Sequence, residues 1–404
     1  MEIHGHVDPE FRAVRDEFER NFNERGDLGA SVCVIVDGQT VADLWSGVAD
    51  PTTGAPWRKD TLTLLMSTTK GATSLCVHML IDRGELDLDA PVAAYWPEFA
   101  TNGKGGVTVR MLLNHQAGLP TLRETLVEGQ FLDWEYMVNS LANETPFWEP
   151  GTSIGYHGFT FGWLVGELIR RVTGKMPGIF FRDEVASPLG LDLWIGIPAS
   201  ELHRVAPLRP DPDDFLTAVL ASGEELGPHF RAVFANTGGY TMPNAWNTAS
   251  YYQAELPASG GIGNGRSVAQ LYAPLALGGS YNGVRLVSPE AIVRMQAIQS
   301  AIGSDQIFGM SSRFTLGFAN FGGERGLPVT AFGHVGWGGS AGFADPGAGL
   351  AIGFVPNQMR DSERYPEMAR FEALTDAAYR ALGYRRGKSG IMIGPTSAVG
   401  ASAR

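Results

Sequence analysis

The sequence predicts a fold of the α/β plus all-α class, in which a mostly antiparallel sheet is flanked by helices and a helical lobe is inserted in the chain. β-rich runs occur near both ends of the 404-residue chain, helical patterns fill its middle, and loops rich in Gly and Pro separate those helices. We expect residues 1–64 and 305–385 to form the α/β lobe and residues 65–304 to form the mainly helical lobe. Residues 386–404 are small and polar, which is typical of a flexible tail.

The N-terminal part of the sheet is predicted from a hairpin signal that follows an amphipathic helix. Two β-rich runs within residues 28–45 are separated by Asp37-Gly38, a dipeptide that favours a tight turn between antiparallel strands. Residues 64–81 then carry apolar side chains on almost every side, which predicts a helix buried in the middle of the protein. Gly84 is a suitable residue to end that helix.

The rest of the chain supplies helices first and strands afterwards. Helical patterns occur in residues 108–115, 159–174, 266–279 and 288–298. Strand patterns return in residues 314–321, 330–339 and 340–356. Asp345-Pro346-Gly347 predicts a turn inside the last of these segments, and a final helix is expected over residues 368–382. The strands of the two chain ends are therefore expected to share one sheet.

Charge and targeting signals narrow the classes of function. A net charge of −12 without a cluster of Lys and Arg argues against a nucleic-acid partner. The N-terminus lacks the basic and apolar regions of a secretory signal, and no stretch reaches the length of a membrane span. We therefore expect a cytoplasmic protein with neither a nucleic-acid nor a membrane partner, and its oligomeric state stays open.

Neither a metal nor an organic cofactor is expected. Cys33 and Cys76 lie in apolar segments, which indicates buried reduced thiols, and two cysteines alone do not favour a structural zinc site. Residues 383–389 have one residue too few between their glycines for a phosphate loop. The glycine-rich residues 260–265 lack the strand–turn–helix context of a dinucleotide site.

The segment MSTTKGATS, residues 66–74, is the most informative stretch for chemistry. Ser67 and Lys70 are three residues apart, so on a helix they face the same side and the amine can reach the hydroxyl. An enclosed site would shift the lysine toward its neutral form, which can remove the serine proton. The alternative is an N-capping serine beside a surface lysine. A lysine inside an otherwise apolar helix favours the catalytic interpretation.

Two other serines compete for the role of nucleophile. Ser153 and Ser340 each lie in a G-x-S-x-G pattern, which marks a nucleophile elbow when a strand enters the serine and a helix leaves it. Pro146 and Pro150 prevent a strand before Ser153, and the residues after Ser340 have a strand pattern. We therefore prefer Ser67.

Three segments together carry a family resemblance: MSTTK, then GYHG at residues 155–158, then GHVGWGG at residues 333–339. In this order they resemble the serine β-lactamase and penicillin-binding protein superfamily, most closely the class C β-lactamase-like branch that includes the family VIII carboxylesterases. Blocks such as VTVRMLLNHQAGLP and GFADPGAGLAIGFVPN extend the resemblance over about residues 12–383. The resemblance implies a β-lactamase-like fold with the site where its two lobes meet.

The resemblance also implies roles for individual residues. Ser67 would be the nucleophile, and Lys70 would be the general base or would share that task with Tyr156, whose phenol could pass a proton to the leaving group. The backbone N–H groups of Ser67 and Trp337 would form the oxyanion hole. Simpler interpretations remain for two of these residues, because Tyr156 could be an aromatic contact beside a turn and Trp337 could merely cover the sheet.

Two departures from the β-lactamase pattern bear on the substrate. Gly158 stands where Tyr-x-Asn has its asparagine, and His334-Val335-Gly336 stands where Lys-Thr-Gly is usual. The missing amide and cation would weaken binding of the acylamino arm and the carboxylate of a β-lactam, which favours neutral esters. Gly158 and Gly336 would border the substrate. His334 would support the polar network around Tyr156, or would simply be a hydrogen-bonded histidine on an edge strand.

The sequence thus predicts a serine carboxylesterase that hydrolyses small carboxylic esters through an acyl-enzyme on Ser67, without a metal or cofactor. One alternative is an acyltransferase, or an amide or peptide hydrolase with weak β-lactam activity, on the same site. A further alternative is a penicillin-binding-like protein that is acylated without turnover.

Overall fold

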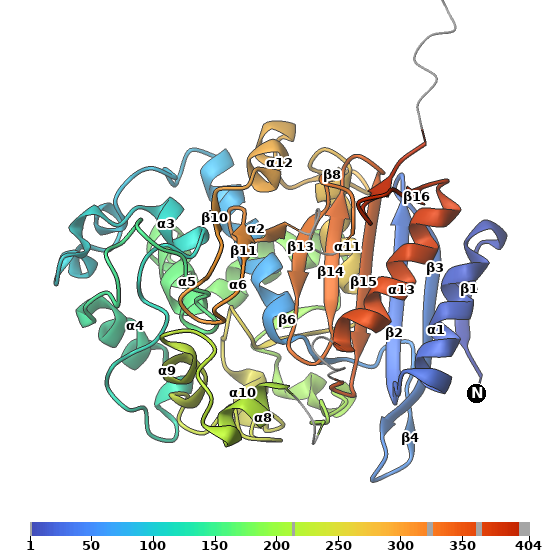
Figure 1. Cartoon of the computed structure of the whole chain (residues 1–404), viewed down its shortest axis with the longest axis horizontal. Helices are drawn as coiled ribbons and strands as arrows, with labels where there is room; N and C mark the ends of the chain where they lie inside the picture. Colours follow the sequence, from blue (N-terminus) through green and yellow to red (C-terminus); the bar gives the residue numbers. More distant parts are fainter. Residues whose placement is uncertain (1, 212–214, 321–325, 361–365, 396–404) are drawn as a thin grey trace, which may run out of the picture.

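One long antiparallel sheet forms the frame of the protein, as seen in a computed structural model that describes residues 2–211, 215–320, 326–360 and 366–395 (Figure 1). All its neighbouring strands are antiparallel, which confirms the predicted kind of sheet. Strand β2 of the N-terminal hairpin pairs directly with β15 from the C-terminal part of the chain. In spatial order, the strands are β1 (His4–Val7), β3 (Gln39–Asp50), β2 (Gly29–Val36), β15 (Leu350–Pro356), β14 (Ala341–Asp345), β13 (Phe332–Val335), β12 (Ala319–Asn320), β11 (Ser312–Phe314) and β10 (Ser300–Ile302), and β4 (Ala55–Pro56) pairs with β3.

Helices cover both faces of this sheet. The terminal helices α1 (Arg12–Glu24) and α13 (Pro366–Ala381) pack together on one face, and α11 (Gly265–Ala276) lies against the other (Figure 1). Successive side chains of β15 alternate between the two cores, with Ile352 on the α1–α13 side and Ala351 on the α11 side. Burial of both faces explains why β15 is an unbroken run of apolar residues.

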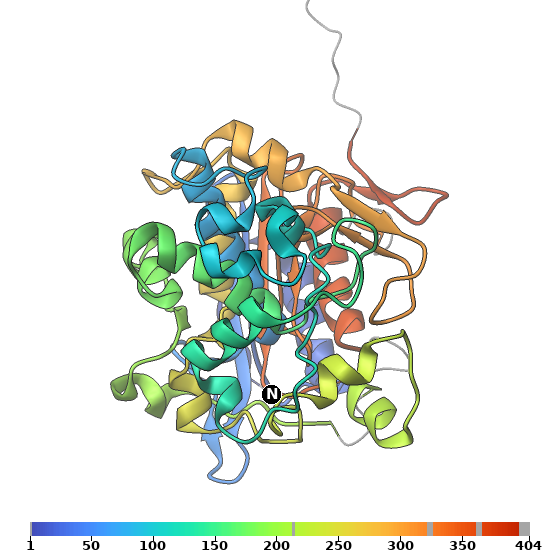
Figure 2. The ribbon, with the colours of Figure 1, turned by 90° about the vertical axis from the view of Figure 1, so that its left-hand side faces the viewer.

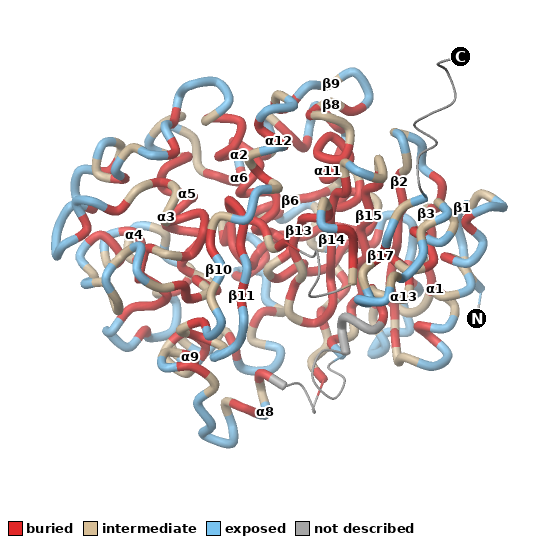
Figure 3. Tube along the Cα trace, turned by 45° about the horizontal axis from the view of Figure 1, so that its top comes forward, coloured by how far each residue is buried: buried red, intermediate tan, exposed pale blue. Residues whose placement is uncertain are grey.

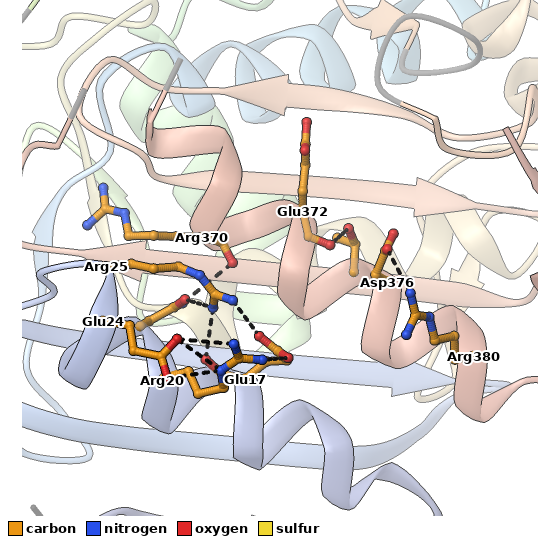
Figure 4. Close-up of polar contacts among 10 residues, drawn as sticks. Glu17, Arg20, Glu24, Arg25, Arg370, Glu372, Asp376 and Arg380 are labelled. Carbon is orange, nitrogen blue, oxygen red and sulfur yellow. Dashed lines mark hydrogen bonds and ion pairs between the residues drawn. The ribbon is translucent and has the colours of Figure 1, made fainter. Parts of the chain in front are cut away.

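Charged side chains line the outer surface of the α1–α13 layer. Glu17 forms ion pairs with Arg20 at 2.9 Å and with Arg25 at 2.7 Å, and Asp376 pairs with Arg380 at 3.6 Å (Figure 4). Such solvent-accessible pairs contribute about 0–1 kcal/mol each. The layer therefore owes its stability mainly to the apolar side chains beneath it.

Most of the remaining helices form the helical lobe, on the side of the molecule away from α1 and α13 (Figure 2). Helix α2 (Thr69–Asp82) runs through the protein, and each of its residues from Thr69 to Leu80 is buried (Figure 3). The other helices are α3 (Val109–Leu113), α4 (Trp134–Asn143), α5 (Thr160–Thr173), α6 (Pro177–Phe181), α7 (Ser187–Leu189), α8 (Phe215–Ser222), α9 (Phe230–Ala235), α10 (Ala249–Gln253) and α12 (Pro289–Gln296). Three short strands form a second sheet: β5 (Thr63–Leu64), β7 (Gly261–Gly263) and β6 (Trp194–Ile195). Two further strand pairs are hairpins: β8 (Ser280–Tyr281) with β9 (Val284–Arg285), and β16 (Arg385–Arg386) with β17 (Met392–Ile393).

The two turns predicted from short motifs are confirmed. Asp37 and Gly38 both have positive φ, 47° and 81°, as the tight turn between β2 and β3 requires. Asp345 ends β14, and its Oδ1 accepts a hydrogen bond of 2.9 Å from the N–H of Gly347 before β15 begins. The buried cysteines are also confirmed, because Cys33 and Cys76 are both free and enclosed.

The structure differs from the sequence predictions at two boundaries. The buried helix was expected from residue 64, but Leu64 pairs with Ile262 in β5–β7 and the α-helix begins at Thr69. The tail was expected from residue 386, but residues 385–393 form the β16–β17 hairpin, which is held because Met392 is buried and donates its N–H to Gly326 O at 2.8 Å. Residues 396–404 of the predicted tail lie outside the described residues.

In the described part of the chain, no helix is both long enough and apolar enough to cross a membrane.

Candidate active site

Ser67 lies in a single 3₁₀ turn, Met66–Thr68, that leads directly into α2. The turn starts from an unusual backbone conformation, because Met66 has a φ of 44°. Ser67 is half-buried, whereas Lys70 on the first turn of α2 is completely buried. Ser67 is thus partly accessible to solvent, whereas Lys70 is enclosed.

Three polar atoms surround the Lys70 amine. Its Nζ lies 3.1 Å from Ser67 Oγ, 2.6 Å from Gly158 O and 3.0 Å from Ala258 O. Burial lowers the pKa of Lys70 well below its ordinary value, because removing an ammonium ion from water is costly. A neutral amine has two N–H groups and one lone pair. In that form the two carbonyls can accept the two N–H groups, and the lone pair can accept a proton from the Ser67 hydroxyl.

Tyr156 completes a chain of hydrogen bonds through Ser67. The Tyr156 O–H donates to Ser67 Oγ at 2.9 Å, and Lys70 Nζ lies 4.9 Å from the centre of the phenol ring. Burial raises the pKa of Tyr156 above its ordinary value, so the phenol keeps its proton at neutral pH. Ser67 Oγ is therefore in hydrogen-bond contact with both the Tyr156 phenol and the Lys70 amine.

The loop that follows β13 is tied to the Ser67 turn by side-chain hydroxyls. Ser340 Oγ donates to Leu65 O at 2.6 Å and lies 2.9 Å from Thr68 Oγ1. Within the loop, Gly336 N–H donates to Ser340 O at 2.7 Å. These bonds hold Gly336, which directly precedes Trp337, close to the turn that carries Ser67. The Trp337 side chain packs against another tryptophan, with ring centres 5.1 Å apart.

A buried arginine supports the same loop from the opposite side. Arg370 of α13 donates to Gly338 O and to Gln358 O, each at 3.0 Å, and forms an ion pair with Asp27. Its side chain is 1% exposed and that of Asp27 is fully buried. The sequence interpretation missed this support and the Thr68–Ser340 contact, because their partners are far apart in the chain and follow no local pattern.

His334 lies on β13 with its ring centre 6.2 Å from that of Tyr156. It is buried, and its Nδ1 lies 2.7 Å from the carbonyl oxygen of Val335. His334 is therefore next to Tyr156, as the sequence interpretation expected. Its role in the polar network of the site stays a prediction.

Neither rival serine has the geometry of a nucleophile elbow. Ser153 lies in a turn between α4 and α5, where the structure describes no strand, and its Oγ accepts a hydrogen bond of 3.0 Å from Gln306. Ser340 is buried and is followed by β14 rather than by a helix. Its hydroxyl is fully engaged in holding the loop described above.

Apolar side chains border the site on the side of Gly158. A Cβ atom at Gly158 would lie 3.5 Å from Val233 Cγ1 and 3.6 Å from the Phe234 ring. These two residues belong to a small hydrophobic cluster, defined here by Leu216, Val219, Phe230, Val233, Phe234 and Ile307, which packs against Tyr156, Phe159, Phe308 and Trp337. The space that an asparagine side chain would enter is thus bounded by hydrocarbon.

Across the residues that the structure describes, no three His, Cys, Asp or Glu side chains gather closely enough to hold a metal ion.

Comparison with known protein families gives a match over most of the chain. The family model described as beta-lactamase matches residues 16–377. The Esterase/beta-lactamase LipL of Mycobacterium tuberculosis is 37% identical over 372 residues, which cover 88% of this chain and 83% of that protein. Esterase EstB of Burkholderia gladioli is 31% identical over 201 residues, covering 43% of this chain and 48% of that protein.

Solved structures show the same likeness. A family VIII carboxylesterase superposes with a TM-score of 0.83 at 40% identity, covering 95% of this chain and 100% of that one. A penicillin-binding protein homolog from Caulobacter crescentus superposes with a TM-score of 0.86 at 36% identity, again covering 95% of this chain and 100% of the other.

Proposed function

This chain belongs to the beta-lactamase family and is a serine hydrolase, and from that premise we propose that it is a carboxylesterase that cleaves small carboxylic esters through an acyl-enzyme on Ser67. The observation that carries the proposal is the contact of one hydroxyl, Ser67 Oγ, with a buried amine at 3.1 Å and a phenol at 2.9 Å. Relatives described as an esterase/beta-lactamase, an esterase and a family VIII carboxylesterase support the same activity.

In the acylation step, Ser67 Oγ attacks the ester carbonyl carbon while its proton passes to neutral Lys70. The carbonyl oxygen becomes an oxyanion, which the backbone N–H groups of Ser67 and Trp337 would stabilise. The carbon–oxygen bond to the alcohol then breaks, and the leaving oxygen takes a proton from the Lys70–Tyr156 pair. Because these two groups are coupled, the proton they share belongs to the pair.

In the deacylation step, water attacks the acyl carbon of the Ser67 ester. The Lys70–Tyr156 pair accepts one proton from that water, and Ser67 Oγ regains a proton as the acid leaves. Each cycle consumes one ester and one water and releases one alcohol and one acid, and the enzyme returns to its starting protonation state.

The preference for neutral esters is supported by the surroundings of Gly158. A β-lactam brings a polar acylamino arm, and the structure offers the hydrocarbon of Val233 and Phe234 where an asparagine amide could otherwise bind it. By resemblance to the Lys-Thr-Gly motif of β-lactamases, His334 on β13 would take the place of a permanently charged lysine. An uncharged acyl group suits these contacts better than a charged ring system.

The first test compares hydrolysis of a short-chain nitrophenyl ester by the wild-type protein, Ser67→Ala and the matched serine control Ser153→Ala. We expect turnover to fall more than about 1,000-fold in Ser67→Ala and to stay near wild type in the control. Mass spectrometry should locate the acyl group on Ser67. Full activity in Ser67→Ala with an intact fold would overturn the proposal.

Added alcohols and amines separate esterase from acyltransferase activity. An esterase should give mainly the free acid, whereas an acyltransferase should transfer most of the acyl group to the added nucleophile. A stable mass adduct without turnover would indicate a penicillin-binding-like protein instead.

A further inference from the structure

A buried histidine outside the predicted catalytic set holds the backbone around Tyr156. His115 follows α3, is 1% exposed and has a φ of 63°, in the left-handed region that non-glycine residues seldom adopt. Its ring centre lies 5.1 Å from that of Tyr156 and 4.4 Å from that of Phe314. A non-glycine residue keeps such a strained backbone conformation only where the surrounding contacts hold it.

Two hydrogen-bond acceptors of His115 bind the residues on either side of Tyr156. The N–H of Gly155 donates to the main-chain oxygen of His115 at 3.1 Å, and the N–H of His157 donates to its Nδ1 at 3.2 Å. The residue immediately before Tyr156 and the residue immediately after it are therefore both held by the same histidine. Between these two anchors, the phenol oxygen reaches Ser67 Oγ at 2.9 Å.

The hydrogen-bond partners fix the protonation of both histidines. Because Nδ1 of His115 accepts, its ring proton is on Nε2. His157 donates from Nδ1 to Gly155 O at 2.7 Å and accepts at Nε2 from Leu119 N–H at 3.0 Å. Both rings are thus neutral, and burial lowers the pKa of each, that of His157 to about 4. His157 reinforces the anchor, because one of its ring nitrogens binds Gly155 and the other binds Leu119.

We propose that His115 is a positioning residue for the esterase reaction, whose carbonyl oxygen and Nδ1 fix the segment around Tyr156 so that its phenol meets Ser67. This inference rests on the proposed function. It assigns His115 no contact with substrate. What His115 supplies is the placement of a proton donor to within the small tolerance that proton transfer requires.

Three substitutions of His115 distinguish the contribution of its left-handed backbone from that of its side-chain acceptor. His115→Asn tolerates a left-handed backbone and places Oδ1 where Nδ1 was, so it retains both anchors. His115→Gly tolerates the backbone but has no side-chain acceptor. His115→Ala has neither advantage. Asn282→Ala is the matched control for backbone strain, because Asn282 has a φ of 48° and is exposed in the turn between β8 and β9.

The readout is kcat and KM for the nitrophenyl ester, with circular dichroism to confirm folding. We expect kcat to fall about 10- to 100-fold in His115→Gly and His115→Ala, with KM changed less than about threefold. His115→Asn should restore kcat to within about threefold of wild type, and Asn282→Ala should leave it unchanged. If His115→Ala does not fold, the comparison of Asn with Gly carries the test.

Two results would overturn this inference while leaving the proposed function standing. One is a folded His115→Gly with wild-type kcat, and the other is a His115→Asn variant as impaired as His115→Gly. Failure of the proposed function would look different, because the wild-type rate would then persist in Ser67→Ala measured in the same series.

Discussion

Replacing Gly336 by alanine tests whether the loop beside the Ser67 turn must approach it as closely as the structure shows. A Cβ atom at Gly336 would lie 2.2 Å from Leu65 O and 2.3 Å from Ser340 Oγ. Real Cβ atoms essentially never approach other heavy atoms closer than 3.0 Å, so the loop and the turn must separate by about 0.8 Å at the backbone contact. The obstacle includes a main-chain carbonyl, which cannot rotate away as a long side chain could.

The displacement acts on the peptide group that would hold the oxyanion. Trp337 N–H directly follows Gly336, so a shift of nearly 1 Å moves this donor relative to Ser67. A misplacement of that size costs up to about 100-fold in rate, and we expect kcat to fall about 10- to 100-fold in Gly336→Ala. Overpacking should also lower the free energy of unfolding by about 1–3 kcal/mol.

The assay is stopped-flow hydrolysis of a nitrophenyl ester, in which the acylation burst is resolved from steady turnover. Both the burst rate and the steady rate should fall, because a tetrahedral oxyanion forms in acylation and again in deacylation. Gly303→Ala is the matched control, since a Cβ atom there would meet nothing within 4 Å. A Gly336→Ala protein with a wild-type burst rate would refute the reasoning, because the loop would then tolerate displacement or Trp337 N–H would not bind the oxyanion.

Three further predictions address other contacts of the site. Ser340→Ala should lower the free energy of unfolding by about 1–3 kcal/mol in urea titrations and still allow acylation of the nucleophile, which would exclude Ser340 as that group. Tyr156→Phe should lower kcat by about 100-fold or more at neutral pH, measured with the same ester. In a pH–rate profile, kcat/KM should rise as pH rises through the pKa of Lys70, because burial lowers that pKa and only the neutral amine accepts a proton; a rate that falls over this limb would contradict the assignment.

The sequence predicted those parts of the fold that local physical chemistry determines. The Asp37-Gly38 turn requires positive φ angles and the Asp345 turn is closed by a hydrogen bond from Gly347 N–H to the Asp345 side chain, so the residue types identify both turns. The β-lactamase-like fold expected from three ordered motifs is confirmed by the family match and by the structure of a family VIII carboxylesterase. Strand β1 was not predicted, because His4–Val7 has no apolar alternation and is recruited by backbone pairing with β3.

The sequence indicated which side chains gather at the site but not what holds them. Ser67, Lys70 and Tyr156 come together as expected, and their catalytic roles stay predictions. The acceptors of the Lys70 amine are the backbone carbonyls of Gly158 and Ala258, and every residue has a carbonyl, so no residue type could signal them. His115 was part of a recognised block, yet its function as an anchor depends on a backbone angle that its residue type does not specify.

A comparison of two buried lysines explains why burial alone does not make a base. Neither Lys104 nor Lys70 is exposed to solvent, and burial lowers the pKa of both, less at Lys104 than at the more deeply buried Lys70. The carboxylate of Glu144 opposes that shift at Lys104, where a nearby negative charge favours the ammonium form. Among the residues that the structure describes, no carboxylate exerts this effect on Lys70, whose N–H groups face two uncharged carbonyls. The prediction that Lys70 acts as the base therefore rests on a buried amine paired with neutral acceptors, and an acidic residue introduced beside Gly158 should lower the rate of ester hydrolysis by favouring the charged form of Lys70.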